Sequence, residues 1–228
     1  MREIVLDTET TGLDPLQGHR IIEIGCMELN NRSQTGARFH AYINPQRDVP
    51  EEARRISNLT TEFLQDKPLF ADVAEGFLEF IGDSPLVIHN AEFDLKFLNS
   101  ELGKIKRKAI ASARAVDTVL IARRKFPGSP ASLDALCRRF NINLDERKIK
   151  GHGAMLDVEL LVQVYLELLG GRQAGLEFVA KSSGASAAVL RRAMQPRPTP
   201  LAPRLTDGER ARHDELIQSL GGSAIWKK

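Results

Sequence analysis

The chain has 228 residues, enough for one well-packed core with an appendage or for two small domains. Its hydrophobic share of 42% and charged share of 27% are typical of a soluble globular protein. The net charge of +2 is too small to indicate a nucleic-acid or membrane partner by itself, and no stretch approaches the roughly 20 apolar residues of a membrane span. Acidic residues follow the first Met too early for a signal peptide, and Cys26 and Cys137 sit in apolar runs typical of buried free thiols. We therefore expect a cytoplasmic protein without a membrane partner.

The first part of the sequence predicts strands joined by short connections, which favours an antiparallel meander. The strand segments are REIVLD, RIIEIGCMELN and GARFHAYINP, with NRSQTG as the turn between the last two. Helical spacing follows in PEEARRI, TTEFL and FADVAEGFLEFI. In the last of these, one apolar stripe carries Phe70, Val73, Phe77 and Phe80.

The middle of the chain alternates between strand and helix. PLVIHN predicts a short buried strand, AEFDLKFLNSEL a helix, and AVDTVLIARRKF a strand that runs into a helix. Ser132 is placed to cap a helix in SLDALCRRFNI, and Gly170 and Gly171 close a long amphipathic helix over AMLDVELLVQVYLELL. These elements predict an α/β fold in which helices pack on a mixed sheet.

The composition changes after about residue 180. Residues 181–206 hold four prolines, many small residues and no acid, so they cannot bury enough apolar surface to offset their chain entropy. We predict a domain over 1–180, a flexible Pro/Ala-rich linker over 181–206 and a short helical tail over 207–228. Ile225 and Trp226 end that tail; an exposed Trp indicates a binding partner, and the alternative is that the tail folds back on the domain.

Acidic side chains recur at the ends of elements that must pack inward. Asp7 and Glu9 end the first strand on one face, Asp94 lies one turn into a helix, and Asp157 begins another after a glycine-flanked His152. Each of these residues, taken alone, fits a solvated position equally well. If the four carboxylates converge, they need cations, and oxygen ligands favour Mg²⁺ or Mn²⁺. Two such ions suit the displacement of a phosphodiester, and an imidazole suits removal of a proton from the attacking water.

The motifs VLDTETTG, VIHNAEFD and HGAMLD resemble the three motifs of the DnaQ-like, DEDD-type 3′→5′ exonucleases, in the same order and spacing. The resemblance implies a ribonuclease-H-like fold with a mixed five-stranded sheet. It also implies two divalent cations held by Asp7, Glu9, Asp94 and Asp157. Position 153 is Gly rather than Tyr, so the match is to the histidine subtype, with His152 as general base.

Longer stretches, among them IIEIGCMELNNR, EFLQDKPLFADVAEGF and GGSAIWKK, closely resemble the epsilon proofreading subunits of bacterial DNA polymerase III. That resemblance implies DNA proofreading, with release of nucleoside monophosphates from a DNA 3′ end. It implies binding to the polymerase catalytic subunit through Ile225 and Trp226, and it leaves open whether a small accessory subunit also binds. Two other functions stay open: a free-standing RNA-trimming exonuclease and a catalytically inactive binding module.

The resemblance also implies contacts to substrate and to a sliding clamp. Besides the acids Asp7, Glu9 and Asp157, the residues expected at the terminal nucleotide are Thr8, Thr10, Glu52 and Ser57. Ser57-Asn58 stands where the family usually has His-Gly, so Ser57 is expected to replace the histidine only weakly. The segment QAGLEF resembles a clamp-binding motif, in which the anchors are Gln173, Leu176 and Phe178; an ordinary helix end is the alternative.

Overall fold

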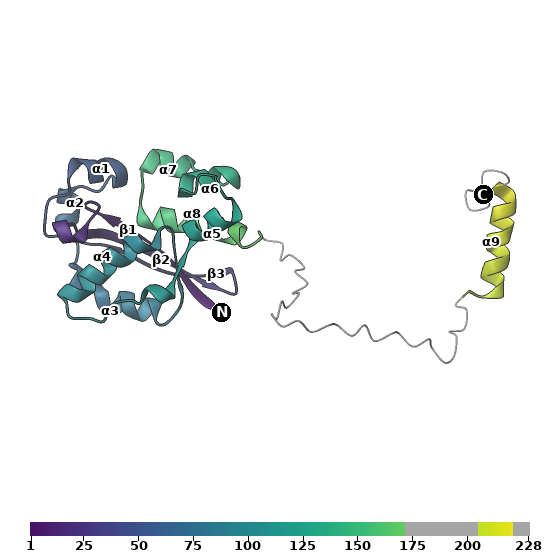
Figure 1. The fold of residues 1–228 in the computed structure, drawn as a ribbon, viewed down its shortest axis with the longest axis horizontal. Coiled ribbons are helices and arrows are strands. Elements are labelled where there is room, and N and C mark those ends of the chain that lie inside the picture. The colour runs from purple at the N-terminus through teal and green to yellow at the C-terminus, as the bar shows by residue number, and fades with distance from the viewer. Residues whose placement is uncertain (172–204, 221–228) are drawn as a thin grey trace. The chain divides into compact units, whose positions relative to one another are not determined.

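One mixed sheet forms the centre of the first of two compact units, Met1–Phe178 (Figure 1). The structure is a computed structural model that describes residues 1–171 and 205–220. The sheet order is β3-β2-β1-β4-β5. Its strands are β1 (Arg2–Thr10), β2 (Ile21–Asn30), β3 (Ser33–Tyr42), β4 (Leu86–Ile88) and β5 (Ala115–Asp117). The first three strands pair antiparallel, as predicted, whereas β4 pairs parallel with both β1 and β5. The carboxyl ends of β1, β4 and β5 therefore meet at one edge of the sheet.

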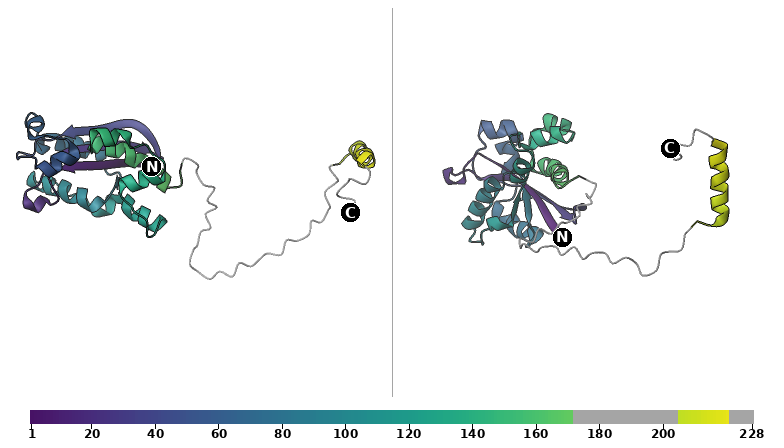
Figure 2. Two further views of the ribbon diagram at one scale, coloured as in Figure 1. Left: turned by 90° about the horizontal axis from the view of Figure 1, so that it is seen from above. Right: turned by 45° about the vertical axis from the view of Figure 1, so that its right-hand side comes forward.

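Helices cover both faces of this sheet (Figure 2). They are α1 (Glu51–Ser57), α2 (Thr61–Gln65), α3 (Phe70–Ile81), α4 (Ala91–Lys104), α5 (Thr118–Lys125), α6 (Leu133–Arg139), α7 (Asp145–Lys150) and α8 (Ala154–Leu168). Two 3₁₀ turns lie at Pro15–Gln17 and Ser112–Arg114. The predicted mixed α/β architecture is confirmed, and Ser132 caps α6 by accepting a hydrogen bond from the Ala135 N–H. Helix α7 is absent from the sequence prediction. No helix in the described ranges is long and apolar enough to cross a membrane.

The hairpin between β2 and β3 is tighter than predicted. The whole segment NRSQTG was expected as a turn, but the structure reverses the chain over Asn31 and Arg32 alone. Both residues have positive φ, 49° and 65°. Two consecutive left-handed residues match the twist of a two-residue hairpin, so pairing resumes at once with Ser33 opposite Asn30.

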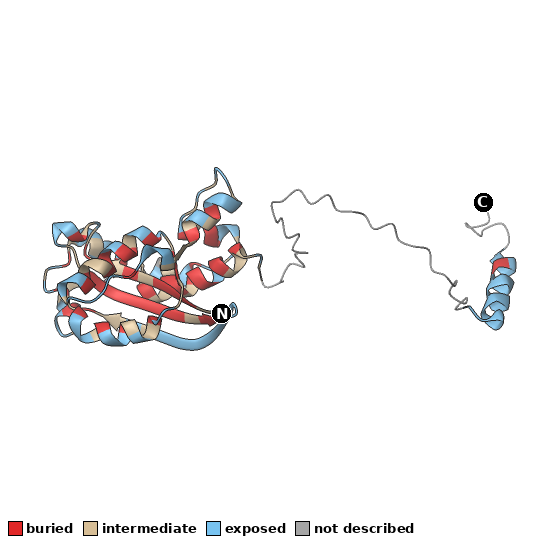
Figure 3. Cartoon of the chain, turned by 60° about the horizontal axis from the view of Figure 1, so that its bottom comes forward, coloured by how far each residue is buried: buried red, intermediate tan, exposed pale blue. Residues whose placement is uncertain are grey.

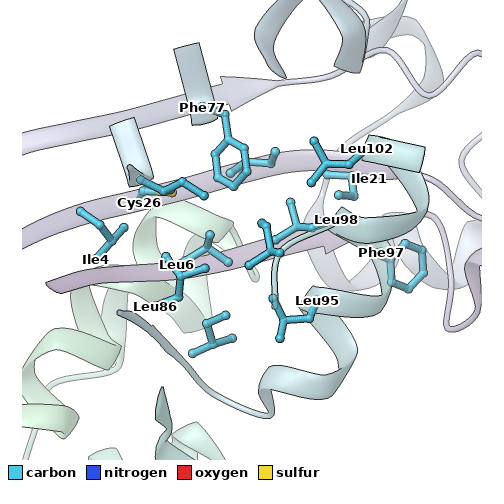
Figure 4. Close-up of a cluster of buried hydrophobic side chains, with 14 of the residues drawn as sticks. Ile4, Leu6, Ile21, Cys26, Phe77, Leu86, Leu95, Phe97, Leu98 and Leu102 are labelled. Carbon is cyan, nitrogen blue, oxygen red and sulfur yellow. The ribbon is translucent and has the colours of Figure 1, made fainter. Parts of the chain in front are cut away.

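The alternation of β1 divides its side chains between two cores. Ile4 and Leu6 pack with Phe77 and Leu98 in the core beneath α3 and α4, which Figure 4 shows. Val5 faces the opposite core, formed with α5, α6 and α8. The central strands are buried, whereas β3 is largely exposed (Figure 3). Because Asp7 and Glu9 follow Val5 with period two, they project on the α8 side of the sheet, and Thr8 projects on the α4 side.

The N-terminus of α8 rests directly on β2. A Cβ on Gly25 would lie 2.7 Å from the backbone carbon of Ala154, so only glycine allows this approach. The buried carboxylate of Glu23 accepts the Ala154 N–H at 3.0 Å and is itself paired with His40 Nε2 at 2.7 Å. Gly25 lies opposite Asp7 in the strand register. The first turn of α8, with Asp157, is thereby placed next to the acidic end of β1.

The second unit, Val179–Lys228, contributes one described helix, α9 (Asp207–Leu220). Thr206 and Glu209 form a capping box: each side chain accepts a hydrogen bond from the other residue's backbone N–H. The helical character predicted after the linker is therefore present. The linker, apart from its last two residues, lies outside the described residues, as do the expected anchors Gln173, Leu176, Phe178, Ile225 and Trp226.

Candidate active site

The end of β1 lies between α4 and α8 and brings acids from both helices together. Asp94, in the first turn of α4, is 3% exposed and accepts two hydrogen bonds from Thr8, from the backbone N–H at 3.0 Å and from Oγ1 at 2.7 Å. Asp157, in the first turn of α8, is 5% exposed. One ligand atom each from Glu9, His152 and Asp157 lie within 4.8 Å of one another, which a single cation can bridge. The structure thus brings together all four predicted acids and His152.

Burial and neighbouring charges raise the pKa values of Asp7, Glu9 and Asp94. The pKa of Asp7 is raised well above its usual value, first by burial and then by the charges of Asp94 and Asp157. Burial, followed by the charge of Asp157, raises the pKa of Glu9 to about 8. Burial also raises the pKa of Asp94 to about 7, against the hydrogen bonds from Thr8 that lower it. The ionised forms are unfavourable here without a cation, and this is the electrostatic condition of a divalent-metal site.

Arg147 of α7 supplies one positive charge to this cluster. Its Nε and Nη2 donate to the two carboxylate oxygens of Asp157 at 2.7 and 2.6 Å. Nη2 also lies 2.9 Å from His152 Nδ1, and Nη1 pairs with Asp134. The pKa of His152 is lowered, mainly by burial and then by Arg147, which keeps the imidazole neutral near pH 7.

Two cavities flank the acids. One of about 490 Å³ is lined by Glu9, Thr8, Thr10 and Glu52, together with Ile56 and Phe93 among its apolar residues. The other, of about 290 Å³, is lined by Asp7, His152 and Asp157, and by His89, Ser132, Leu133, Asp134 and Arg147. The larger cavity thus contains Glu9, and the smaller contains Asp7, Asp157 and His152. Asp94, which is buried, and Ser57 line neither of them.

Ser57 ends α1 instead of reaching the larger cavity. Its hydroxyl donates to the Ala53 carbonyl at 3.0 Å and accepts from the Leu59 N–H. Its neighbour Ile56 does reach the cavity, and the Ile56 carbonyl accepts the His152 N–H at 2.9 Å. The Ser57 hydroxyl is therefore engaged within its own turn, whereas Ile56 lines the larger cavity.

Sequence reasoning missed three residues of the site: Glu23, His89 and Arg147. Glu23 orients α8, and His89 contacts Thr118 Oγ1 at 2.8 Å through Nδ1 while lining the smaller cavity. His89 directly follows β4 in VIHNAEFD, so its place at the carboxyl edge of the sheet was a usable signal. For Arg147 no signal existed, because DERKIK is typical of a solvated charged segment.

Comparison with known proteins agrees with this geometry. The family described as Exonuclease matches residues 4–165, which include the four acids and His152. The chain belongs to this exonuclease family. It is 56% identical over 186 residues to the DNA polymerase III subunit epsilon of Rickettsia conorii, covering 80% of each chain. It is 41% identical over 244 residues to the subunit of that name in Salmonella typhimurium, covering 99% of this chain and 97% of the relative.

Solved structures show the same fold. Exonuclease X in complex with 5′ overhanging duplex DNA superposes with a TM-score of 0.59 at 24% identity, over 73% of this chain and 90% of that one. The nuclease domain of 3′hExo, a DEDDh family member bound to rAMP, gives a TM-score of 0.62 at 17% identity, over 74% and 91%. With the epsilon relatives, these findings identify the exonuclease as a 3′–5′ enzyme that depends on divalent metal ions, as the sequence motifs implied.

Proposed function

We propose that this exonuclease proofreads DNA synthesis: it hydrolyses the terminal phosphodiester at a DNA 3′ end and releases nucleoside monophosphates as a subunit of a replicative polymerase. The observation that carries the proposal is the meeting of Asp7, Glu9, Asp94, Asp157 and His152 at the end of β1. Similarity to named epsilon subunits over nearly the whole chain supports the replicative setting.

The acids fit a pair of hard divalent cations, Mg²⁺ or Mn²⁺, because the donor set is dominated by carboxylate oxygens. Asp7, Glu9 and Asp157 would hold the catalytic ion, and Asp94 would help to hold the second. When bound, the ions neutralise the acids and stabilise charge on the attacking and leaving oxygens. His152 accepts the proton of the attacking water, and its lowered pKa keeps it in the neutral form this role requires.

The larger cavity is proposed to receive the terminal nucleotide. Thr8, Thr10 and Glu52 offer polar contacts, and Ile56 and Phe93 offer apolar surface to the base. A frayed mispaired end supplies a single strand more often than a paired end does, so mismatch preference follows from the substrate without base-specific contacts.

The partners are proposed from the sequence outside the described residues. The tail with Ile225 and Trp226 binds the polymerase catalytic subunit, and Gln173, Leu176 and Phe178 bind the sliding clamp. A linker between domain and tail raises the effective concentration of the nuclease at the primer end. A small accessory subunit is a further proposed partner, and we propose that the protein acts in the cytoplasm.

Single-turnover hydrolysis of a 3′-mispaired DNA primer in Mg²⁺ tests the proposed chemistry. Asp7→Ala and His152→Ala should each slow cleavage at least about 100-fold, in line with the loss of a metal ligand or of a general base. Glu79→Ala, on the exposed side of α3, is the matched control. Rates within about threefold of the wild type for either site variant would rule the assignment out.

Two comparisons separate the remaining possibilities. A ribonucleotide primer of the same sequence should be cleaved more slowly than the DNA primer; faster cleavage would favour RNA trimming. Co-purification with the polymerase subunit should be lost when residues 207–228 are removed, and retention would contradict the tail as the binding segment.

A further inference from the structure

Arg147 contacts the proposed metal ligand and the proposed base at the same time. Its side chain is only 10% exposed, although α7 is a short surface helix. The guanidinium reaches both oxygens of Asp157, Nδ1 of His152 and, on its third side, Asp134. Among the described residues, Arg147 thus connects the proposed metal ligand, Asp157, with the proposed general base, His152.

The contact with His152 has a chemical consequence. Arginine has donors only, so Nδ1 of the imidazole must be the acceptor in this hydrogen bond. A neutral imidazole has a single acceptor nitrogen, and its other nitrogen carries the proton. While Arg147 donates to Nδ1, His152 therefore has no lone pair free to take a proton from water.

The contact with Asp157 makes Arg147 a competitor of a divalent cation for the same carboxylate. Both carboxylate oxygens already accept short, charge-assisted hydrogen bonds from Arg147. A divalent cation that takes an oxygen of Asp157 as ligand competes with these bonds and repels the guanidinium. Asp134 lies on the far side of Arg147 and is 39% exposed. It offers a partner to the guanidinium when the divalent cation displaces it from Asp157.

We propose that Arg147 is a latch that couples metal loading to release of the general base. One guanidinium holds Asp157 and His152 in a resting arrangement. Binding of a divalent cation at Asp157 breaks its bonds to these two residues and leaves it paired with Asp134 alone, which frees Nδ1 of His152. Arg147 is a positioning residue in this scheme, because it acts through Asp157 and His152. The proposal rests on the proposed function of those two residues.

Metal affinity, measured by calorimetric titration of Mn²⁺ into the full-length protein, tests the competition. Arg147→Gln should bind Mn²⁺ about tenfold more tightly, since the ion no longer displaces a charge-assisted hydrogen bond. The same variant should melt at a lower temperature in EDTA, because the acids lose their internal counter-ion. Arg138→Gln is the matched control: Arg138 also pairs with Asp134, at 3.6 Å, but is 72% exposed and should change neither value. Equal or weaker Mn²⁺ affinity in Arg147→Gln overturns the proposal.

Nitrogen-15 NMR of histidine-labelled wild-type protein tests the coupling without any substitution. In EDTA, His152 should show a protonated Nε2 and a hydrogen-bonded, unprotonated Nδ1, and Mg²⁺ should change the Nδ1 signal. An Nδ1 signal unaltered by saturating Mg²⁺ refutes the latch even if hydrolysis is normal. By contrast, full activity of His152→Ala refutes the proposed function, so the two failures are distinguishable.

Discussion

Replacing Glu9 with Gln should stabilise the protein in the absence of divalent metal, although Glu9 is a proposed metal ligand. The pKa of Glu9 is raised from 4.5 to about 8. Between these values the folded protein retains a proton that the unfolded chain has released. The stability contributed by the protonated carboxyl is therefore complete below about pH 4.5 and is lost as the pH rises through about 8. Gln carries no charge at any pH and escapes this loss.

The size of the effect follows from the shift. One pKa unit corresponds to about 1.4 kcal/mol, so the shift sets an upper bound of about 5 kcal/mol at pH 8. Glu9 is only partly buried and lines an open cavity, so water reduces the cost of its charge. We expect a gain of about 1–3 kcal/mol, equivalent to a rise of about 2–12 °C in melting temperature.

Thermal unfolding in EDTA from pH 5 to pH 8 measures this gain. Glu9→Gln and wild type should melt together at pH 5 and diverge toward pH 8, with the variant the more stable. In saturating Mg²⁺ the order should reverse, because the wild type gains a ligand that the variant lacks. Glu79→Gln on α3 is the control for removal of an exposed charge. A variant no more stable than wild type at pH 8 in EDTA would refute the claim that crowded acids destabilise the metal-free site.

Three further substitutions test the supports of the site. Gly25→Ala should cost about 1–3 kcal/mol by thermal unfolding and slow single-turnover cleavage at least about tenfold, since its methyl group would force Ala154 and the first turn of α8 away from β1. Thr8→Val should lower the melting temperature by removing a donor to buried Asp94, at a cost of about 1–3 kcal/mol, and Thr8→Ser should restore it. Gly151→Ala, at φ 80° and against the end of α1, should lower the cleavage rate at saturating Mg²⁺ with little change in DNA affinity; a change in affinity alone would contradict it.

The acids of the site were predictable because local rules place them. Alternation in β1 sets Asp7 and Glu9 on one face, and a parallel arrangement of β1 and β4 brings the start of α4, with Asp94, to the same edge. The mixed sheet was predictable from the order of strands and helices along the chain. Only the local placements follow from periodicity; the meeting of Asp7, Asp94 and Asp157, which lie far apart in the sequence, was expected from their joint pattern and from the resemblance to the exonuclease family.

Other parts depend on side-chain directions that periodicity does not determine. Ser57 was expected at the substrate from its register with the family, but it is the last residue of α1, and its hydroxyl is bonded to the Ala53 carbonyl and the Leu59 N–H. Arg147 lies on a helix of six residues, less than two turns, and its partners are set by the packing of α6 and α8. The short hairpin at Asn31 and Arg32 was missed because arginine is uncommon in the left-handed conformation.

Ile56 connects α1 both to the larger cavity and to His152. Its side chain is 52% exposed and faces the cavity proposed for the terminal nucleotide, while its carbonyl holds the backbone of His152. A poorly seated 3′ nucleotide that displaces α1 would also move His152, because the two are joined by this hydrogen bond. The imidazole would then no longer be aligned with the scissile bond. We therefore expect the seating of the primer's terminal nucleotide to be coupled to the position of His152, whichever base that nucleotide carries.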